Sequence, residues 1–396
     1  MRKLLQINVT ANWGSTGKIA ESIGLAAKRQ GWESYIAYGR YSNPSQSKLL
    51  KIGNKLDVYA HYAEQRIFDN EGLASRGASQ NLIRQIQEIQ PDMVQLHNIH
   101  DHYLNYKILF EYLNTTDIQV VWTFHDCWAF TGHCFHFVTK GCERWKTQCY
   151  DCPLQRISPK TLLDRSRKNY ELKKQLFAGC KNLTIVPCSD WMAGFVKESF
   201  LRDKRIQVIH NGVDLNVFQP PLQRKKQEGI RIIAVSNVWH KEKGLYDLFE
   251  LRKRLPGCYE MTMVGLSAEQ LKELPEGIRG IQRTQNVQEL AALYGEADVL
   301  VNPTYADTFP TVNLEALSCG TPVITYRTGG SPEAVDEKTG LVVPQGDLDA
   351  LVAAIHQLRE NPLSSEDCRK RAELLFDKDK CFEQYIELYN RLLSSK

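Results

Sequence analysis

The chain has 396 residues, of which 42% are hydrophobic and 24% are charged. These fractions are ordinary for folded globular proteins, and they exclude a disordered or low-complexity chain. The length exceeds what a single hydrophobic core usually supports, so we expect two domains of about 200 residues each.

Neither a secretory signal nor a membrane span is expected. The first residues have too short an apolar core for a signal peptide, and no window approaches the roughly 18 apolar residues that cross a bilayer. We therefore expect a cytoplasmic protein. In that reducing compartment its eleven cysteines are expected to be thiols or metal ligands rather than disulfides.

Charge differs between the two halves of the chain. Residues 1–215 hold 28 Lys and Arg against 20 Asp and Glu, or +8, and the remainder holds 22 against 26, or −4. The basic half could face an anionic acceptor or a membrane surface. Scattered, solvated charge is an equally good interpretation.

The first predicted strand, residues 4–9, leads into a loop and then a helix over residues 18–30. Gly14 and Gly17 lie at this strand-to-helix turn, where glycine allows the backbone to come close to a ligand. The loop is not a Walker A loop, because the glycines are too close together and Ile19 stands where Ser or Thr is required.

Strands and helices then alternate in the βα order that predicts a Rossmann-like parallel sheet. The strands are expected at 34–38, 93–97, 119–124, 183–188 and 206–209, and helices at 81–90 and 105–113. His125 and Asp126 follow the strand 119–124, at the strand end where ligands usually bind. His97, His100 and His102 lie at the end of the strand 93–97, where they could contact an acceptor.

A cysteine-rich loop spans residues 131–153. Its cysteines are spaced C-x7-C-x6-C-x2-C, at Cys134, Cys142, Cys149 and Cys152. Four thiolates could close a structural zinc tetrahedron, and His133 or His136 could replace a thiol. A loop without metal is the alternative. Because the loop lies within a sheet domain, we expect it to shape the acceptor side, and we expect no nucleic-acid partner.

The stretch 159–179 is basic and amphipathic. It could form a helix that lies on an anionic membrane or meets a lipid-linked acceptor, or an ordinary surface helix with a core-facing stripe. Residues 219–229 are polar and marked by prolines, which predicts an interdomain linker with the boundary near residue 220.

A second βα series begins with the strand 231–235 and continues with strands at 261–264, 278–281, 299–303 and 323–326. Lys243 precedes Gly244 at a strand-to-helix turn, where an ammonium group suits a diphosphate. Asp307 lies in the loop after the strand 299–303, and Glu315 lies in the helix that follows. The free N–H groups at that helix start could receive phosphate. An ordinary strand-loop-helix unit with solvated acids is the alternative.

The sequence DTFPTVNLEALSCGTP, residues 307–322, resembles the acid-x7-acid signature of retaining glycosyltransferases of family 4, also called glycosyl transferases group 1. Asp307 stands in place of the usual Glu, and Pro310 in place of a Gly. The segments HNGVD at 210–214 and GGSPE at 329–333 match further family patterns. The resemblance covers nearly the whole chain and is most specific over residues 298–347.

The resemblance implies the GT-B fold, an α/β architecture in which two Rossmann-like doubly wound domains face each other across a cleft. Residues 1–220 would bind the acceptor and residues 221–396 the nucleotide sugar, and the last helix, at about 380–393, would pack back on the N-terminal domain. The implied reaction moves a sugar from a nucleotide-sugar donor to a saccharide or lipid-linked saccharide acceptor, in surface polysaccharide assembly. The protein would be cytoplasmic, or peripheral at the inner membrane face.

The resemblance also implies residue roles. Asp307 would contact hydroxyls of the transferred sugar, His125 would contact the donor sugar near its reacting carbon, and Lys243 would bind the diphosphate. Asn237 stands where the family has Arg, and Lys241 or His240 could supply the missing charge. The full expected donor-binding set is Gly14, Gly17, Asn237, Lys241, Phe309, Thr311 and Glu315.

No Asp-x-Asp stands at a strand end, so catalysis is expected to need no divalent cation. The competing interpretation is a non-catalytic protein that binds a nucleotide or a polysaccharide and uses a zinc loop to contact a partner. Turnover of nucleotide sugars separates the two, since a binding protein shows affinity without hydrolysis.

Overall fold

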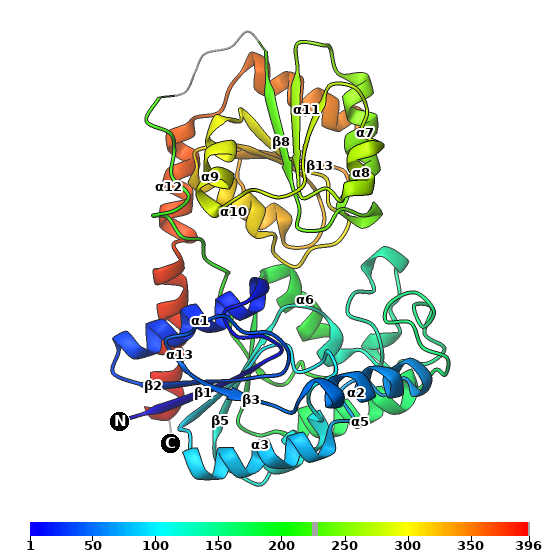
Figure 1. Ribbon diagram of the computed structural model, residues 1–396, viewed down its shortest axis with the longest axis vertical. Helices are drawn as coiled ribbons and strands as arrows, with labels where there is room; N and C mark the ends of the chain where they lie inside the picture. Colours follow the sequence, from blue (N-terminus) through cyan, green and yellow to red (C-terminus); the bar gives the residue numbers. More distant parts are fainter. Residues whose placement is uncertain (224–228, 395–396) are drawn as a thin grey trace. The chain divides into compact units, whose positions relative to one another are not determined.

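The computed structural model describes residues 1–223 and 229–394. Residues 224–228 of the predicted linker lie outside the described residues. The chain forms two compact units (Figure 1). The N-terminal unit comprises Met1–Ile209 together with the chain from Phe382 onward, and the second unit comprises His210–Cys381.

The N-terminal unit is built on a parallel sheet of order β3-β2-β1-β4-β5-β6-β7. Its strands are β1 Lys3–Asn8, β2 Glu33–Tyr38, β3 Lys48–Lys51, β4 Met93–Leu96, β5 Gln119–Phe124, β6 Leu183–Pro187 and β7 Arg205–Ile206. The strand order reverses at the neighbours β1 and β4, which is the crevice where doubly wound sheets bind ligands.

Helices connect these strands, and three short 3-10 turns follow β5. The helices are α1 Gly14–Arg29, α2 Lys55–Phe68, α3 Arg76–Ile89, α4 Tyr106–Leu113, α5 Ser166–Gly179 and α6 Asp190–Glu198. The 3-10 turns are η1 Trp128–Phe130, η2 Val138–Lys140 and η3 Arg144–Lys146. The central strands β4 and β6 are buried along their whole length, as expected for parallel strands covered on both faces.

The last helix, α13 (Lys378–Ser394), packs against the N-terminal sheet unit beside α1, as predicted (Figure 1). Leu388 and Tyr389 are fully buried in a core that also contains Ile23 of α1. Tyr389 donates a hydrogen bond of 2.8 Å to Gln95 in β4, and the hydroxyls of Tyr385 and Thr123 lie 3.0 Å apart. Helix α13 is thus part of the hydrophobic core of the N-terminal unit.

The second unit repeats the design with a parallel sheet of order β10-β9-β8-β11-β12-β13. Its strands are β8 Arg231–Val235, β9 Glu260–Val264, β10 Ile278–Ile281, β11 Val299–Asn302, β12 Val323–Tyr326 and β13 Gly340–Val343. Its helices are α7 Leu245–Arg254, α8 Ala268–Lys272, α9 Val287–Glu296, α10 Thr311–Ser318, α11 Leu348–Glu360 and α12 Ser365–Leu375, with 3-10 turns η4 Lys241–Lys243 and η5 Ser331–Ala334. The predicted pair of Rossmann-like sheets is confirmed.

Several local features differ from the sequence expectation. Helix α1 begins at Gly14 rather than at residue 18, so Gly14 and Gly17 belong to the helix and not to the loop before it. The edge strand β3 and the helix α2 were not predicted, and the helix expected over residues 159–179 begins only at Ser166. Before Ser166 the chain runs as a loop beside α2, because the backbone N–H groups of Leu162 and Leu163 bond to the carbonyls of Arg66 and Ile67. Within α5 itself, Leu176 and Phe177 are buried, so this helix is a surface helix with a core-facing stripe.

Candidate functional site

Lys243 and Asp307 meet at the carboxyl ends of β8 and β11, which are neighbours in the second sheet. Lys243 Nζ lies 2.6 Å from Asp307 Oδ2, and the two side chains are 29% and 21% exposed. The second carboxylate oxygen accepts a hydrogen bond of 3.2 Å from the Phe309 N–H. Two of the predicted site residues therefore form one preoriented ion pair that solvent or a ligand can reach.

Gly244 explains why Lys243 has its position. It has φ +77°, in the left-handed region, and an added Cβ would lie 2.3 Å from the carbonyl oxygen of Pro303. Only glycine fits where this turn packs on the chain that follows β11. The Glu242 carbonyl also accepts a hydrogen bond of 2.8 Å from the Tyr305 N–H. These contacts hold Lys243 next to the loop that carries Asp307.

Helix α10 begins at Thr311 directly after Pro310, so its first N–H groups face the same strand end. Glu315, half-buried one turn further, accepts a hydrogen bond of 2.9 Å from the hydroxyl of Tyr294 on α9. The buried Asn313 joins β11 to the next loop through contacts of 2.8 Å with Asn302 and 2.9 Å with Ser331. These hydrogen bonds fix the start of α10 relative to α9, β11 and the loop that holds Ser331.

Phe309 has a role that its sequence position did not reveal. Its ring is 3% exposed and stacks on the imidazole of His210, with centroids 4.7 Å apart and an interplanar angle of 11°. His210 Nε2 lies 3.3 Å from Glu333 Oε2. Sequence reasoning gave His210 and Glu333 no role, although both stand in the HNGVD and GGSPE segments that carried the resemblance.

The other predicted donor-side residues surround this group without joining the ion pair at its centre. Asn237 and Lys241 are exposed, and Thr311 is half-buried. Lys241 begins the 3-10 turn that ends with Lys243. The exposed position of Lys241 leaves its ammonium available to a phosphate.

In the N-terminal unit, Gly14 and Gly17 differ in their surroundings. Gly14 opens α1, and a Cβ added there would meet no heavy atom within 4 Å, whereas one added to Gly17 would lie 2.6 Å from Thr10 Oγ1. Gly17 is thus required by packing against the end of β1. Only Gly14 borders open space.

His125 and His97 lie side by side after β5 and β4. His97 Nδ1 is 3.2 Å from His125 Nε2, and His97 Nε2 is 3.1 Å from Gln6 Oε1. Burial lowers the pKa of His125 to about 4 and lowers that of His97 as well. Both imidazoles are therefore neutral near pH 7 and cannot supply positive charge.

The neighbouring loop, residues 98–103, is strained and rich in charge. Asp101 and His102 have φ of +81° and +70°, a conformation that persists in non-glycine residues only where the surroundings impose it, often at ligand sites. His102 Nε2 lies 3.0 Å from Glu71 Oε2. Burial disfavours the charge on Glu71, but His102 outweighs it and lowers the pKa of Glu71 to about 2.

His100 and Asp126 form a second buried pair, with Nε2 and Oδ2 2.9 Å apart. Burial opposes protonation of His100, yet the Asp126 carboxylate more than offsets it, so the pKa of His100 is raised. Burial likewise opposes ionisation of Asp126, but His100 lowers the pKa of this carboxyl to about 2. His100 Nδ1 has no hydrogen-bond partner among the described residues.

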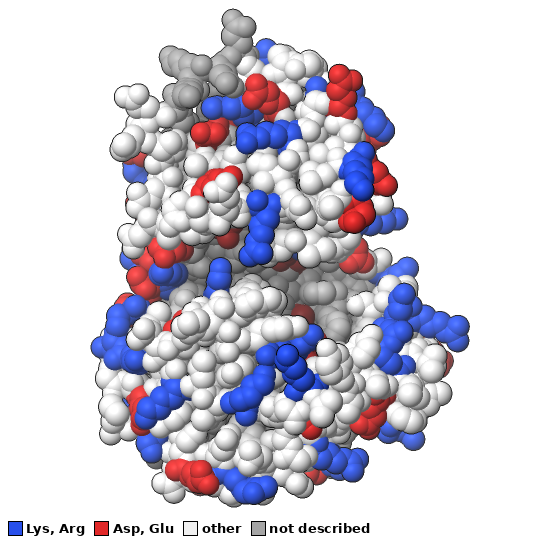
Figure 2. All heavy atoms as spheres, viewed as in Figure 1, with Lys and Arg blue, Asp and Glu red and all other residues white. Residues whose placement is uncertain are grey.

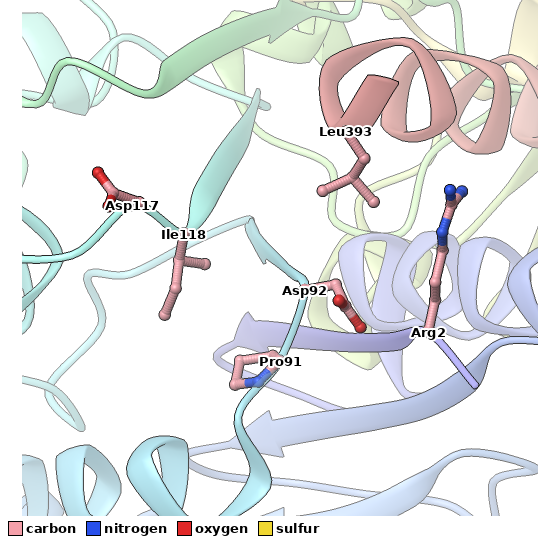
Figure 3. A pocket seen from close by; sticks show the side chains of 6 residues that line it. All are labelled: Arg2, Pro91, Asp92, Asp117, Ile118 and Leu393. Carbon is pink, nitrogen blue, oxygen red and sulfur yellow. The ribbon is translucent and has the colours of Figure 1, made fainter. Parts of the chain in front are cut away.

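A separate surface cavity of about 490 Å³ lies at the opposite edge of the N-terminal sheet. Figure 3 shows its lining side chains, which come from the amino ends of the strands and from the last helix: Arg2, Pro91, Asp92, Asp117, Ile118 and Leu393. Parallel sheets bind ligands at their carboxyl edge. This cavity is therefore not part of the candidate site.

Two doubly wound sheets with their ligand-binding edges at the carboxyl ends of the strands match the GT-B fold. Residues 17–217 match the sequence profile described as Glycosyltransferase Family 4, and residues 229–361 match the one described as Glycosyl transferases group 1. The chain belongs to glycosyltransferase family 4.

Individual relatives agree with this assignment. The chain is 24% identical to the putative colanic acid biosynthesis glycosyl transferase WcaC of Escherichia coli K12, over 98% of this chain and 100% of the relative. Its fold is similar to sucrose-phosphate synthase from Thermosynechococcus elongatus, with a TM-score of 0.73 at 16% identity and full coverage of both chains. Anabaena Alr3699/HepE, solved in complex with UDP, has a TM-score of 0.67 at 13% identity, over 99% of this chain and 100% of that chain.

Within residues 1–223 and 229–394, no helix combines the length and the apolar character that crossing a bilayer requires.

The His100–Asp126 pair gives a stability prediction that depends on pH. Because the pKa of His100 is raised, its ion pair stabilises the fold fully below the ordinary histidine pKa and is lost as pH rises through the raised value. His100→Gln should therefore lower the free energy of unfolding by about 1–3 kcal/mol near pH 5. The loss should shrink clearly at about pH 9.

Urea unfolding of both proteins at the two pH values measures this difference. His100→Gln in an Asp126→Asn background is the matched control, because the pair is then already broken. An equal loss at both pH values would contradict an ionic role for His100.

Proposed function

We propose that the protein transfers a hexosyl group from a nucleotide sugar to a saccharide or lipid-linked saccharide acceptor, with retention of anomeric configuration and without a catalytic metal. The donor would bind the His210–Cys381 unit and the acceptor the Met1–Ile209 unit. The observation that carries the proposal is the Lys243–Asp307 pair beside the start of α10. Similarity to WcaC supports a place in surface polysaccharide assembly.

In this mechanism the donor diphosphate takes the Lys243 ammonium as its partner, and the Asp307 carboxylate turns to hydroxyls of the transferred sugar. The bond between the sugar C1 and the phosphate oxygen breaks, and its electron pair stays on the diphosphate. The acceptor hydroxyl attacks C1 on the same face, and its proton passes to a leaving phosphate oxygen. Lys243 and the first N–H groups of α10 stabilise the charge that develops.

The remaining predicted residues have supporting roles in the proposal. Neutral His125 donates a hydrogen bond to the donor sugar, and Glu315 accepts hydrogen bonds from ribose hydroxyls. Lys241 adds positive charge next to Asn237, where the family has Arg. Thr311 and Phe309 shape the start of α10, and Gly14 and Gly17, in the first turn of α1, lie on the side of the N-terminal unit where the ligands would bind.

A non-catalytic nucleotide- or polysaccharide-binding protein is the competing function. It would bind nucleotide sugars through the same Lys243–Asp307 site and would release no nucleoside diphosphate. A panel of nucleotide sugars, tested for hydrolysis in the absence of acceptor, distinguishes the two.

The two acids should have different kinetic effects. Asp307→Asn should lower kcat by ten- to a thousand-fold, or about 1.4–4 kcal/mol, because the lost interaction is strongest in the transition state. Glu315→Gln should instead raise the donor KM, because the ribose does not change during the reaction. Steady-state kinetics of both variants measure this difference. Full kcat in Asp307→Asn would show that this residue has no catalytic role.

Removal of divalent cations should leave the rate nearly unchanged, because Lys243 and backbone N–H groups carry the diphosphate charge. The measurement is turnover before and after EDTA treatment, with magnesium or manganese added back. Protein whose zinc content is unchanged by the treatment serves as the control. Complete loss of activity that either ion restores would overturn the metal-independent assignment.

The N-terminal unit also has a surface suited to an anionic membrane, and we propose that the protein binds the inner membrane face through it. This apolar face consists of α2 and the loop 157–163, joined by the bonds from Leu162 and Leu163 to α2. Its most exposed apolar side chains are Leu56 at 77%, Leu162 at 72% and Tyr59 at 68%, and Tyr62, Ile67, Phe68, Ile157 and Leu163 are exposed as well.

Exposed cations accompany the apolar face along the same two segments and the start of α5: Lys55, Arg156, Lys160, Arg167 and Lys168. On the visible side of this unit, Lys and Arg cover more of the surface than Asp and Glu do, and some of them gather near its centre (Figure 2). Apolar side chains next to cations match the boundary between acyl chains and anionic headgroups. The membrane contact thus rests on α2 and the loop, whereas the apolar stripe of α5 is buried.

Vesicle cosedimentation tests the apolar face. The protein should sediment with vesicles of phosphatidylglycerol and phosphatidylcholine, less with phosphatidylcholine alone, and less at high salt. The double variant Leu162→Glu, Leu163→Glu should bind at least tenfold more weakly. Leu374→Glu, at a position 74% exposed in the second unit, is the control. Unchanged vesicle binding by the double variant would reject this surface as the membrane contact. A dimer that forms in the wild type and is absent in the double variant would also reject it.

A further inference from the structure

Residues 131–165 form a long segment without regular strands or helices. Only the 3-10 turns η2 and η3 interrupt it, yet it buries Phe137, Trp145 and Leu154. Irregular segments of this length are uncommon in compact domains, and hydrogen-bond ladders cannot account for its order. Some other interaction must hold the buried side chains in place.

Four cysteines of this segment lie around one small cavity. Cys134 is buried and Cys142, Cys149 and Cys152 are half-buried, and all four are reduced. Together they line one small cavity of about 10 Å³. The thiols of Cys134 and Cys152 are in hydrogen-bond contact. Residues far apart in the loop therefore border one common space.

Backbone donors point at two of these sulfurs. The Gly132 N–H donates to Cys149 Sγ at 3.3 Å, and the Leu154 N–H donates to the Cys152 sulfur two residues before it. A Cβ on Gly132 would lie 2.1 Å from the Ser166 carbonyl oxygen and 2.9 Å from the Cys149 Cβ. Glycine alone permits this close approach. N–H groups aimed at sulfur stabilise the thiolate form, which is the form that binds metal.

The two histidines of the loop are excluded as ligands. His133 Nδ1 lies 2.5 Å from Asp69 Oδ1, and Nε2 lies 2.9 Å from the Pro159 carbonyl oxygen, so both ring nitrogens are engaged. His136 is exposed. Of the ligand sets that the sequence allowed, the four thiols remain.

A buried lysine lies next to the thiols. Lys173 of α5 is 1% exposed, and its Nζ donates to the carbonyls of Trp128 and Thr131 at 2.7 and 3.1 Å. The ammonium also lies 3.4 Å from the centroid of the Trp128 ring. Cys134 and Cys149 act on it electrostatically. A zinc ion with four thiolates carries a net charge of −2, which a neighbouring ammonium offsets.

We propose that Cys134, Cys142, Cys149 and Cys152 bind one structural zinc ion and that Lys173 is the positioning residue that balances its charge. Zinc prefers thiolate ligands in a closed tetrahedron when its role is structural. Among the described residues, no three of these sulfurs all lie within 4.8 Å of one another. Zinc binding therefore contracts the loop, and the ion fixes the segment that follows His125 and Asp126. This role is independent of the transferase reaction.

Elemental analysis of the full chain, purified after expression with added zinc, tests the site. About one zinc per chain should be found, and a mercurial reagent that caps thiols should release it. Cys149→Ser should lose the zinc and unfold at lower temperature, whereas Cys258→Ser, at an exposed cysteine in the second unit, should retain it. Wild-type protein without metal, or with a disulfide between Cys134 and Cys152, would overturn the proposal.

The charge-balancing role has its own test, which does not depend on whether Cys149→Ser folds. Lys173→Met keeps the length of the side chain and removes the charge, so a chelator should remove zinc at least tenfold faster than from wild type. Lys174→Met, at an exposed position on the same helix, is the matched control. If Lys173 has only a structural role, Lys173→Met should lower the stability of the zinc-free and zinc-bound forms equally and leave the rate of zinc release unchanged. That result would reject the assignment.

Discussion

Parallel pairing of the two central strands in each sheet is the constraint on which both sites depend. In the second unit β8 pairs with β11, and in the N-terminal unit β1 pairs with β4. Parallel pairing brings the carboxyl ends of both partners to one edge, and the reversal of strand order there keeps the two following crossovers apart. Residues distant in sequence, such as Lys243 and Asp307, therefore come within hydrogen-bond distance.

The same constraint explains how much could be predicted from sequence. Apolar strand runs such as 119–124 and glycines at strand ends are local signals, and they correctly predicted both sheets. Strand β3 has the sequence KLLK and lies at the sheet edge with its two lysines exposed, so no continuous apolar run identified it. Helix α2 exposes Leu56 and Tyr59. Its apolar residues therefore do not follow the spacing that identifies a helix packed on a core.

Parts of the candidate site depend on contacts that sequence spacing does not encode. Glu71 lies in a loop before α3, and only the fold places its carboxylate against His102 from the end of β4. The stacking of His210 on Phe309 likewise joins residues far apart in the chain. Lys243, Asp307 and His125 could be chosen as site candidates from their residue type and their position at strand ends. The partners that orient them could be found only from the tertiary structure.

The Asp69–His133 and Lys243–Asp307 ion pairs differ in solvent exposure. The first stabilises the fold, whereas the second is accessible to a ligand. Asp69 and His133 are 1% and 0% exposed, and breaking such a pair leaves an uncompensated buried charge at a cost of about 3–5 kcal/mol. Lys243 and Asp307 are 29% and 21% exposed, and partly solvated pairs contribute on the order of 1 kcal/mol or less. A diphosphate that brings two negative charges can therefore displace Asp307 from Lys243 at little cost. In the proposed mechanism, the weakness of this pair would let Lys243 receive the donor and leave Asp307 free to meet the sugar.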